Sequence, residues 1–282
     1  MKLPLNTDLT GKTAVITGAG GVIGGIFAKA LAQAGAKVAL LDLNREAAEK
    51  MAQEIQKEGN TAKGYEANVL QKESLKQAHE EILKDFGPCD ILINGAGGNH
   101  PKATTDQEYY EPGTLKEGEK SFFDLEQSGV EMVFNLNFIG TLLPTQEFTT
   151  DMLEREGCSI INISSMNAYA PLTKIPAYSG AKAAVSNFTQ WLAVHFSKSG
   201  IRVNGIAPGF FSTIQNKNLL FEKDGTPTPR TGKILAATPM GRFGEAEELI
   251  GTLLFLLNNE ASGFITGAVI PVDGGFLAYS GV

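Results

Sequence analysis

The chain has 282 residues, of which 43% are hydrophobic and 20% charged, and its formal net charge is −7. This hydrophobic fraction supports a buried core and excludes a disordered chain, while the acidic balance argues against a broad nucleic-acid or anionic-membrane surface. Cys89, Cys158 and the three histidines lack the spacing of a metal site or a disulfide framework, so we expect no metal and two inert, hydrophobic cysteines.

In chain order, short apolar runs alternate with longer segments whose apolar residues recur at helical spacing. The apolar runs predict strands at residues 13–17, 37–42, 63–67, 90–94, 159–163, 201–206 and 268–272. The other segments predict helices at residues 23–34, 46–57, 72–86, 121–154, 177–198 and 245–257. This alternation predicts an α/β fold, a doubly wound parallel sheet of the Rossmann type with about seven strands and helices on both faces.

Two long segments interrupt the alternation, residues 98–120 and 212–244, and both are rich in Pro, Gly, Thr and charged residues. Loops of this length in a compact domain usually cover a binding site, so we expect them on the substrate side. No linker divides the chain, which predicts one domain over residues 1–282. No apolar stretch is long enough to span a bilayer, and residues 1–10 lack the apolar core of a signal peptide. We therefore expect a cytoplasmic protein.

A glycine-rich turn, Thr17-Gly-Ala-Gly-Gly-Val-Ile-Gly24, joins the first strand to the first helix. Glycines permit a tight turn and close approach of a pyrophosphate, and the helix N-terminus supplies positive potential. Its position between strand and helix indicates a dinucleotide site more strongly than its glycines do. Asp42 ends the second strand and could accept ribose hydroxyls while repelling a 2′-phosphate, which favours NAD over NADP. It could also be an ordinary strand-end aspartate, and Arg45 could accommodate a phosphate.

A second pattern is Tyr178-Ser-Gly-Ala-Lys182, in which the phenol and the ammonium share one face of a predicted helix. A neighbouring cation favours the phenolate, so we expect Lys182 to lower the pKa of Tyr178. That would suit Tyr178 as a general acid–base. Ser164 and Ser165 end the preceding strand and could hold a substrate oxygen near the phenol.

Together these features resemble the short-chain dehydrogenase/reductase family over nearly the whole chain. The resemblance rests on residues 17–24, Asn94-Gly-Ala-Gly97, Asn137-Phe-Ile-Gly140, Ser165 thirteen positions before Tyr178, Pro208-Gly209 with Thr213, and Val272-Asp-Gly-Gly275. Two positions depart from the family pattern, because Val22 stands where a glycine is usual and Asn68 where an aspartate is usual. These departures concern details of cofactor contact, since an asparagine can still hydrogen-bond adenine.

The resemblance implies an NAD(P)-dependent oxidoreductase acting on CH–OH groups, with NAD(H) as cofactor. It implies that Tyr178 exchanges the proton, Lys182 holds the ribose and tunes Tyr178, Ser165 orients the substrate oxygen, and Asn137 supports a water-linked proton path. It places the cofactor along Gly18, Gly20, Val22, Ile23, Gly24, Asp42, Asn68, Val69, Asn94, Ala96, Gly97, Tyr178, Lys182, Pro208, Gly209, Phe211 and Thr213.

The substrate side begins with Gly98-Asn-His-Pro-Lys-Ala-Thr-Thr105, in a segment longer than is usual for the family. Five polar or cationic side chains could bind a small sugar acid there: Asn99, His100, Lys102, Asn167 and Arg230. Each could instead be an ordinary solvated loop residue. Residues 94–105 resemble those of bacterial sugar-acid oxidoreductases of the D-mannonate type, which implies interconversion of D-fructuronate and D-mannonate. A gluconate 5-dehydrogenase or another polyol dehydrogenase is the alternative, and a non-catalytic NAD-binding sensor is a distant one.

Three further residues are given structural interpretations. His79 lies among charged residues and is expected at the surface, His195 near an interface, and Arg242 in a structural role. Family members commonly form homotetramers or homodimers by pairing their two long helices. The resemblance therefore implies such an assembly through residues 121–154 and 177–198, with the tail 276–282 as further interface.

Overall fold

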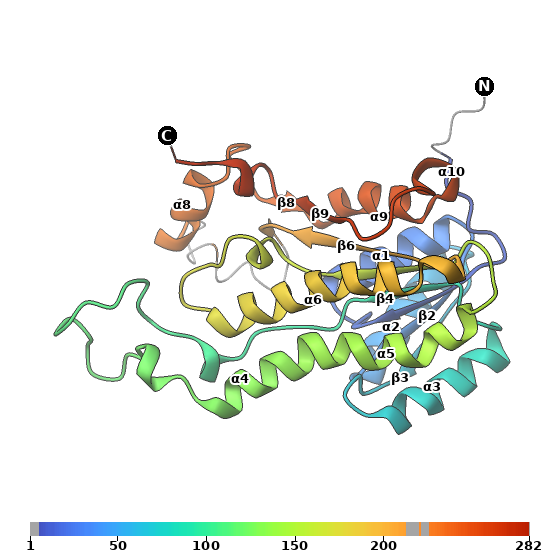
Figure 1. Cartoon of the computed structure of the whole chain (residues 1–282), viewed down its shortest axis with the longest axis horizontal. Helices are drawn as coiled ribbons and strands as arrows, with labels where there is room; N and C mark the ends of the chain where they lie inside the picture. The colour runs from blue at the N-terminus through green and yellow to red at the C-terminus, as the bar shows by residue number, and fades with distance from the viewer. Residues whose placement is uncertain (1–5, 213–219, 221–225, 282) are drawn as a thin grey trace.

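The computed structural model describes residues 6–212, 220 and 226–281. Seven strands form one parallel sheet in the order β3-β2-β1-β4-β5-β6-β9, which confirms the predicted fold class (Figure 1). The strands are β1 Thr13–Thr17, β2 Lys37–Asp42, β3 Ala62–Glu66, β4 Ile91–Asn94, β5 Ser159–Ile163, β6 Arg202–Pro208 and β9 Val269–Val272. A small second sheet pairs β7 Phe211–Ser212 with β8 Gly244–Glu245.

Helices cover both faces of the large sheet. They are α1 Val22–Gln33, α2 Arg45–Lys57, α3 Lys72–Asp85, α4 Gln127–Phe134, α5 Gly140–Phe148, α6 Pro176–His195, α8 Pro229–Ala236, α9 Ile250–Leu257 and α10 Asn259–Ser262. Alternate residues of one strand point to opposite faces, so Ile16 of β1 packs with α1, α2 and α9, whereas Val15 packs with α3, α5 and α6. Of the helices described, none is both long and apolar enough to cross a membrane.

The order of the strands positions the site. β1 lies between β2 and β4, so the chain crosses in opposite directions on the two sides of this pair. In open parallel sheets a ligand binds beyond the carboxyl ends of the strands at such a reversal. The turn after β1 and the residues after β4 and β5 meet there.

The helix predicted over residues 121–154 is wrong at its start and in its regularity. Residues 122–124 form a short 3-10 turn, and α4 begins only at Gln127. A π-helical segment, Asn135–Ile139, then joins α4 to α5. A single π or 3-10 turn shifts the spacing of apolar residues by only about one position, so the sequence pattern still looks like one continuous helix.

The loop expected at residues 212–244 also differs from the structure, since it contains α8. The side chain of Thr228 accepts a hydrogen bond from the N–H of Thr231, and Pro229 occupies the first turn. This is a well-formed helix start, but a helix of eight residues between Pro- and Gly-containing segments is too short to stand out from a loop in the sequence. Residues 98–120 are irregular apart from a 3-10 turn at Pro101–Ala103.

His79 is buried rather than at the surface, so that prediction is wrong. Its Nδ1 lies 2.8 Å from an Oε1 of Glu147, and its Nε2 lies 2.9 Å from Oδ2 of Asp151. Glu147 belongs to α5 and Asp151 to the 3-10 turn Thr149–Met152 that follows it, and no local pattern reveals their position. The contact links α3 to α5.

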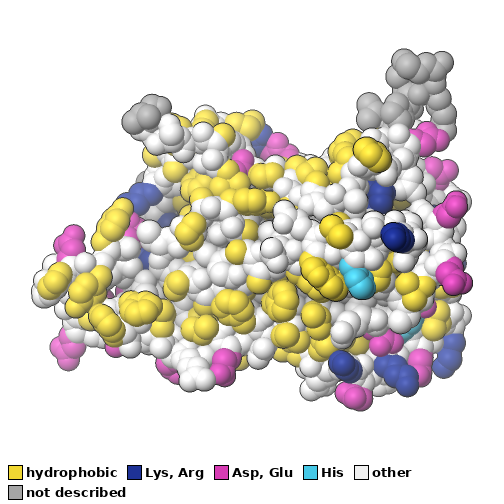
Figure 2. Space-filling model, viewed as in Figure 1, with side chains coloured by type: hydrophobic (Ala, Val, Ile, Leu, Met, Phe, Trp, Pro, Cys, Tyr) yellow, Lys and Arg dark blue, Asp and Glu magenta, His cyan; other side chains and the backbone are white. Residues whose placement is uncertain are grey.

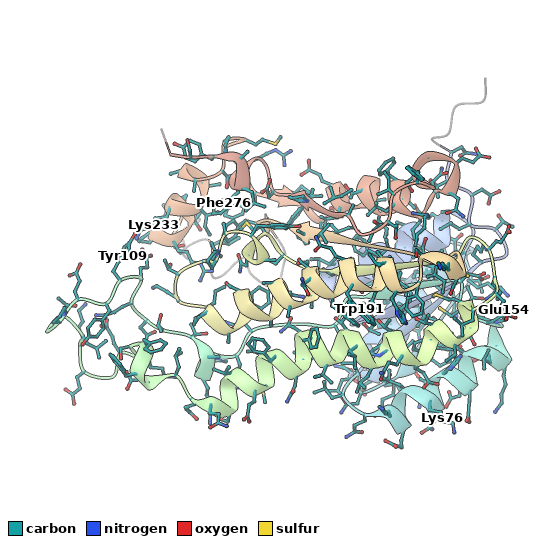
Figure 3. All side chains as sticks on the ribbon, viewed as in Figure 1. Lys76, Tyr109, Glu154, Trp191, Lys233 and Phe276 are labelled. Atoms are coloured by element: carbon teal, nitrogen blue, oxygen red, sulfur yellow. The ribbon has the colours of Figure 1, made fainter. Side chains whose placement is uncertain are left out.

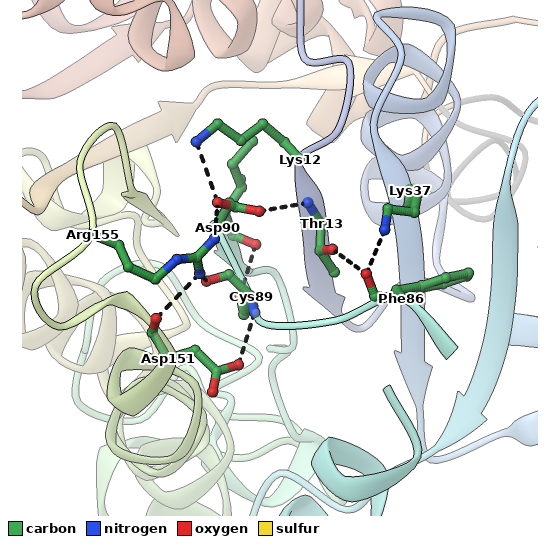
Figure 4. Close-up of polar contacts among 9 residues, drawn as sticks. Lys12, Thr13, Lys37, Phe86, Cys89, Asp90, Asp151 and Arg155 are labelled. Atoms are coloured by element: carbon green, nitrogen blue, oxygen red, sulfur yellow. Dashed lines mark hydrogen bonds and ion pairs between the residues drawn. The ribbon is translucent and has the colours of Figure 1, made fainter. Parts of the chain in front are cut away.

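A polar network continues from Asp151 to the amino ends of the strands (Figure 4). Asp151 accepts the backbone N–H of Cys89, and Arg155 donates to the Cys89 carbonyl and to Asp90. Asp90 in turn accepts from the backbone N–H of Thr13 at 2.8 Å. These bonds tie β1 to β4 at the end of the sheet opposite the glycine-rich turn.

Candidate active site

The glycine-rich turn rests on the carboxylate of Asp42. Oδ2 of Asp42 accepts the N–H of Gly20 at 2.9 Å, and Oδ1 accepts the N–H of Asn44 at 2.9 Å. A Cβ on Gly20 would lie 2.8 Å from Cβ of Ala47 and 3.0 Å from Oδ2 of Asp42, so only glycine fits this close approach. Arg45 is paired with Glu49 at 2.7 Å on its own helix.

A cavity of about 530 Å³ extends from this turn across the carboxyl ends of the strands. Predicted residues that line it are Gly18, Val22, Ile23, Gly24, Asp42, Ala96, Gly97, Ser165, Tyr178, Lys182, Pro208, Gly209 and Phe211. Gly21, Gly95, Gly98 and Ile163, to which no role was assigned from the sequence, also line it, as does Ser164, which was expected near the phenol. Each of these residues lies in or close to a recognised motif, and this proximity is the signal that could have identified them. The cavity thus joins Asp42 at one end to Tyr178 at the other.

The remaining predicted cofactor residues lie off this lining. The Oδ1 of Asn68 accepts the N–H of Leu70, and Val69 lies against Gly140. Asn94 is buried and donates to Thr145 and Asn162. Gly20 donates its N–H to Asp42, and Thr213 lies outside the described residues. Their direct contact with a cofactor stays a prediction.

Asn137 lies in the π-helical segment and fastens the end of β4. Its Nδ2 donates to the carbonyls of Gly98 at 2.7 Å and Val133 at 2.8 Å, and its Oδ1 accepts the N–H of Gly98 at 3.2 Å. A Cβ on Gly97 would lie 2.6 Å from Oδ1 of Asn137 and 3.1 Å from Nζ of Lys182. Glycine at 97 therefore lets both side chains approach the strand end. The side chain of Asn137 positions this backbone, and the water-linked proton path stays a prediction.

Lys182 and Tyr178 come from the first turns of α6, as their spacing predicted. Nζ of Lys182 lies 5.7 Å from the Tyr178 ring centroid and donates to the Ile163 carbonyl at 2.8 Å. The side chain is buried, and burial lowers the pKa of Lys182 to about 8.

The pKa of Tyr178 is raised, contrary to the expected lowering. Burial of the phenol is the largest cause, and a hydrogen bond with Ser165 acts in the opposite direction. The desolvation of the phenolate raises the pKa by more than the hydrogen bond with Ser165 lowers it. Tyr178 therefore keeps its proton at neutral pH, which is the form that can protonate a carbonyl oxygen.

The two serines have different surroundings. Oγ of Ser164 lies 2.6 Å from Oγ of Ser186 and 3.2 Å from the Lys182 carbonyl, so it joins β5 to α6. Oγ of Ser165 accepts the N–H of Asn167 and hydrogen-bonds Tyr178 at the cavity wall. Only Ser165 is placed to share a substrate oxygen with the phenol.

The five candidate substrate residues do not line the cavity. Asn99 bonds Thr104, His100 accepts the Lys102 N–H, and Lys102 pairs with Glu126 at 2.8 Å. Asn167 is buried, and no partner for its Oδ1 lies among the described residues. Arg230 is exposed in the first turn of α8. Their roles toward a substrate stay predictions.

Residues given structural interpretations are placed as follows. His195 is exposed and stacks on Trp191 with ring centroids 4.6 Å apart, and Arg242 pairs with Glu248 at 2.7 Å. Cys89 and Cys158 are fully buried, and burial raises the pKa of both thiols. Reactive thiolate chemistry is therefore disfavoured at both positions.

The arrangement suits proton transfer at a carbonyl or hydroxyl oxygen beside a bound dinucleotide. A sequence profile of the short chain dehydrogenase family matches residues 12–223. The chain belongs to the short-chain dehydrogenase family. It is an NAD(P)-dependent oxidoreductase of this family.

Relatives of this short-chain dehydrogenase span its whole length. A crystal structure described as a "putative D-Mannonate oxidoreductase from Haemophilus influenza" with bound NAD is 61% identical, covers 100% of both chains and superposes with a TM-score of 0.96. The "uncharacterized oxidoreductase UxuB" of Bacillus subtilis is 53% identical over 99% of this chain and 100% of its own length. The 5-keto-D-gluconate 5-reductase of Escherichia coli is 33% identical over 96% of this chain and 97% of its own.

Proposed function

We propose that this short-chain dehydrogenase reduces D-fructuronate reversibly to D-mannonate with NADH. The observation that carries a hydride-transfer reaction is the placement of Tyr178, Ser165 and Lys182 together at the end of the cavity. The substrate is supported by residues 94–105 and by the 61% identical relative described as a mannonate oxidoreductase with bound NAD. One domain would then hold both cofactor and substrate.

The cavity fits NAD(H) in two respects. The carboxylate of Asp42 lines it next to the glycine-rich turn, and Gly18, Gly21 and Gly24 of that turn line it with backbone alone. A carboxylate at this place accepts ribose hydroxyls and opposes a 2′-phosphate. When bound, the nicotinamide supplies the hydride.

Separate side chains orient the substrate, transfer the proton and stabilise the phenolate. The Ser165 hydroxyl donates to the substrate's carbonyl oxygen, and Tyr178 transfers its proton to the same oxygen as the hydride reaches carbon. Lys182, held by the Ile163 carbonyl, stabilises the phenolate that Tyr178 becomes. Asn137 holds Gly98 and so fixes the position of the segment after β4 that Lys182 approaches.

Cofactor choice tests the role of Asp42. Asp42→Ala removes the repelling charge, so kcat/KM with NADPH should rise relative to NADH by about tenfold, as expected for one like-charge contact of about 1.4 kcal/mol. Arg45 pairs with Glu49 and does not compensate in the wild type. Equal efficiency of the wild-type protein with both cofactors would contradict the assignment.

The substrate is tested by NADH oxidation with fructuronate, tagaturonate, 5-ketogluconate and neutral ketoses. Fructuronate should give the highest kcat/KM. A preference for 5-ketogluconate would move the assignment to a gluconate 5-dehydrogenase, which the 33% identical 5-keto-D-gluconate 5-reductase favours. NADH binding without any turnover would indicate a sensor, although all four residues of the catalytic motif are present.

Assembly and compartment are part of the proposal. Exposed apolar side chains lie on the face formed by α4, α5 and α6 (Figure 2), and the exposed Leu153 and Trp191 line one groove there. Exposed apolar patches of this kind mark interfaces. We infer a homodimer or homotetramer that pairs this face, acting in the cytoplasm, where two buried free thiols remain reduced.

A further inference from the structure

Three segments near the active site contact one another through an ion pair and a backbone hydrogen bond. They are the long segment 98–120, the loop before α6, and α8. Nζ of Lys233 on α8 lies 2.8 Å from Oε2 of Glu108. The N–H of Thr105 donates to the carbonyl of Lys174 at 2.9 Å. Neither contact joins neighbours in sequence.

Cations outnumber carboxylates at this meeting point. The Lys233 hydrogen bond lowers the pKa of Glu108, and the charges of Lys233, Lys174 and Arg230 act in the same direction. Among the described residues, no carboxylate lies within ion-pair distance of Lys174 or Arg230. The nearby carboxylate of Asp106 is held by the backbone N–H of Lys120. Within the described part of the chain, Glu108 is thus the one carboxylate in ion-pair contact with this group of three cations.

The cluster lies on the substrate side of the catalytic groups. Lys174 precedes Tyr178 by four residues, and segment 98–120 begins at Gly98 in the cavity wall. α8 packs through Ile234 into a cluster with Phe210, next to the cavity residue Phe211. Figure 1 shows α8, segment 98–120 and the N-terminus of α6 at one end of the molecule, and Figure 3 places Lys233 close to Tyr109.

The backbone at Lys174 is unusual. Its φ is +71°, in the left-handed region that favours glycine. Such strain concentrates at binding sites, where surrounding contacts maintain it. Here the bond from Thr105 holds the Lys174 carbonyl, which directs this part of the loop toward segment 98–120.

We propose that Lys174, Arg230 and Lys233 form a cationic entrance that binds the carboxylate of the incoming sugar acid, with Glu108 as its internal counter-ion. The idea rests on the proposed function for the identity of the substrate. Glu108 neutralises part of the cluster in the free protein and competes with the substrate for Lys233. The substrate's carboxylate contacts these cations equally in the ground state and in the transition state. Loss of the contacts therefore raises KM and leaves kcat unchanged.

The experiment compares charge-neutralising variants of the full chain with fructuronate and NADH. The triple variant K174Q/R230Q/K233Q should raise KM for the sugar acid about tenfold or more with kcat preserved, because three attracting charges are lost. Glu108→Gln should change KM in the opposite direction, lowering it about twofold to threefold. Lys76→Gln removes one positive charge from an exposed position on α3, far from the entrance (Figure 3), and should leave KM unchanged.

Two readouts separate recognition from structural damage. NADH affinity, measured by fluorescence, should be equal in the wild type and all variants, because the entrance lies on the substrate side. An increase in ionic strength should raise the wild-type KM and leave that of the triple variant nearly constant. A rise in KM for Glu108→Gln, or an equal loss of NADH affinity in the triple variant, would overturn the entrance as a carboxylate site.

The entrance and the proposed function fail in distinguishable ways. If the wild type reduces fructuronate and the triple variant has the same KM, only the entrance is wrong. If the wild type reduces none of the keto acids, the proposed function is wrong, and calorimetric binding of D-mannonate to the NAD-loaded protein tests the entrance directly. Equal mannonate affinity in the wild type and the triple variant, or no binding to the wild type, then overturns the entrance as well.

Discussion

Tyr178 combines burial with a hydrogen bond to Ser165, and the proposed mechanism makes it the proton donor. Tyr178→Phe keeps the ring and removes the hydroxyl, so kcat should fall by about 10²-fold or more, with NADH affinity little changed. Steady-state kinetics and NADH fluorescence measure the two effects. Tyr169→Phe is the matched control, because its hydroxyl donates to the Val269 carbonyl rather than facing the cavity, and it should retain activity. Normal turnover in Tyr178→Phe would remove this residue from the mechanism.

The buried Lys182 gives the reduction a defined pH dependence. Its pKa is lowered to about 8, so the ammonium is present below that pH and lost above it, whereas Tyr178 keeps its proton through this range. The kcat/KM for NADH, which reports groups of the free enzyme, should therefore decrease as the pH rises through about 8. Lys182→Arg, whose guanidinium stays charged, should lose this decrease. The same descending limb in Lys182→Met would show that another group causes it.

At the scale of elements, His79 joins α3 to α5 between two carboxylates. His79→Leu fills similar space but leaves Glu147 and the nearly buried Asp151 without this partner. The free energy of unfolding should fall by about 1–3 kcal/mol, the usual cost of an unsatisfied buried group. Urea unfolding at fixed protein concentration measures it. Lys76→Leu, at an exposed position of the same helix, should change stability little, and equal effects of the two substitutions would refute the role of His79.

At the scale of the whole molecule, the exposed apolar face of α4, α5 and α6 dominates the view in Figure 2. Trp191 is 56% exposed there and stacks between Phe188 and His195. Trp191→Glu places a charge in the middle of this face, so the molar mass measured by light scattering should fall to that of a smaller species. His100→Glu, outside this face, should leave it unchanged. A wild-type protein that is monomeric at micromolar concentration would contradict the proposed assembly.

Local patterns in the sequence were enough to predict the succession of the seven strands of the large sheet, the glycine-rich turn, and the Tyr178–Lys182 pair. These features depend on local periodicity, on turn chemistry and on residues one helical turn apart, which a single sequence displays. The resemblance to a family then assigned Ser165 and Asn137, which lie far apart along the chain. The strand order seen in the structure agrees with the doubly wound fold that strand–helix alternation predicted.

Tertiary structure decided everything that depends on burial or on contacts between distant segments. Spacing alone indicated that Lys182 would lower the pKa of Tyr178, but burial of the phenol raises it. From the sequence His79 looked like a surface residue, but Glu147 of α5 and Asp151 of the turn after it enclose its ring. Glu108 and Lys233, 125 residues apart, meet only because segment 98–120 and α8 fold to the same end of the molecule. Desolvation and long-range pairing have no local pattern, so only the folded chain reveals them.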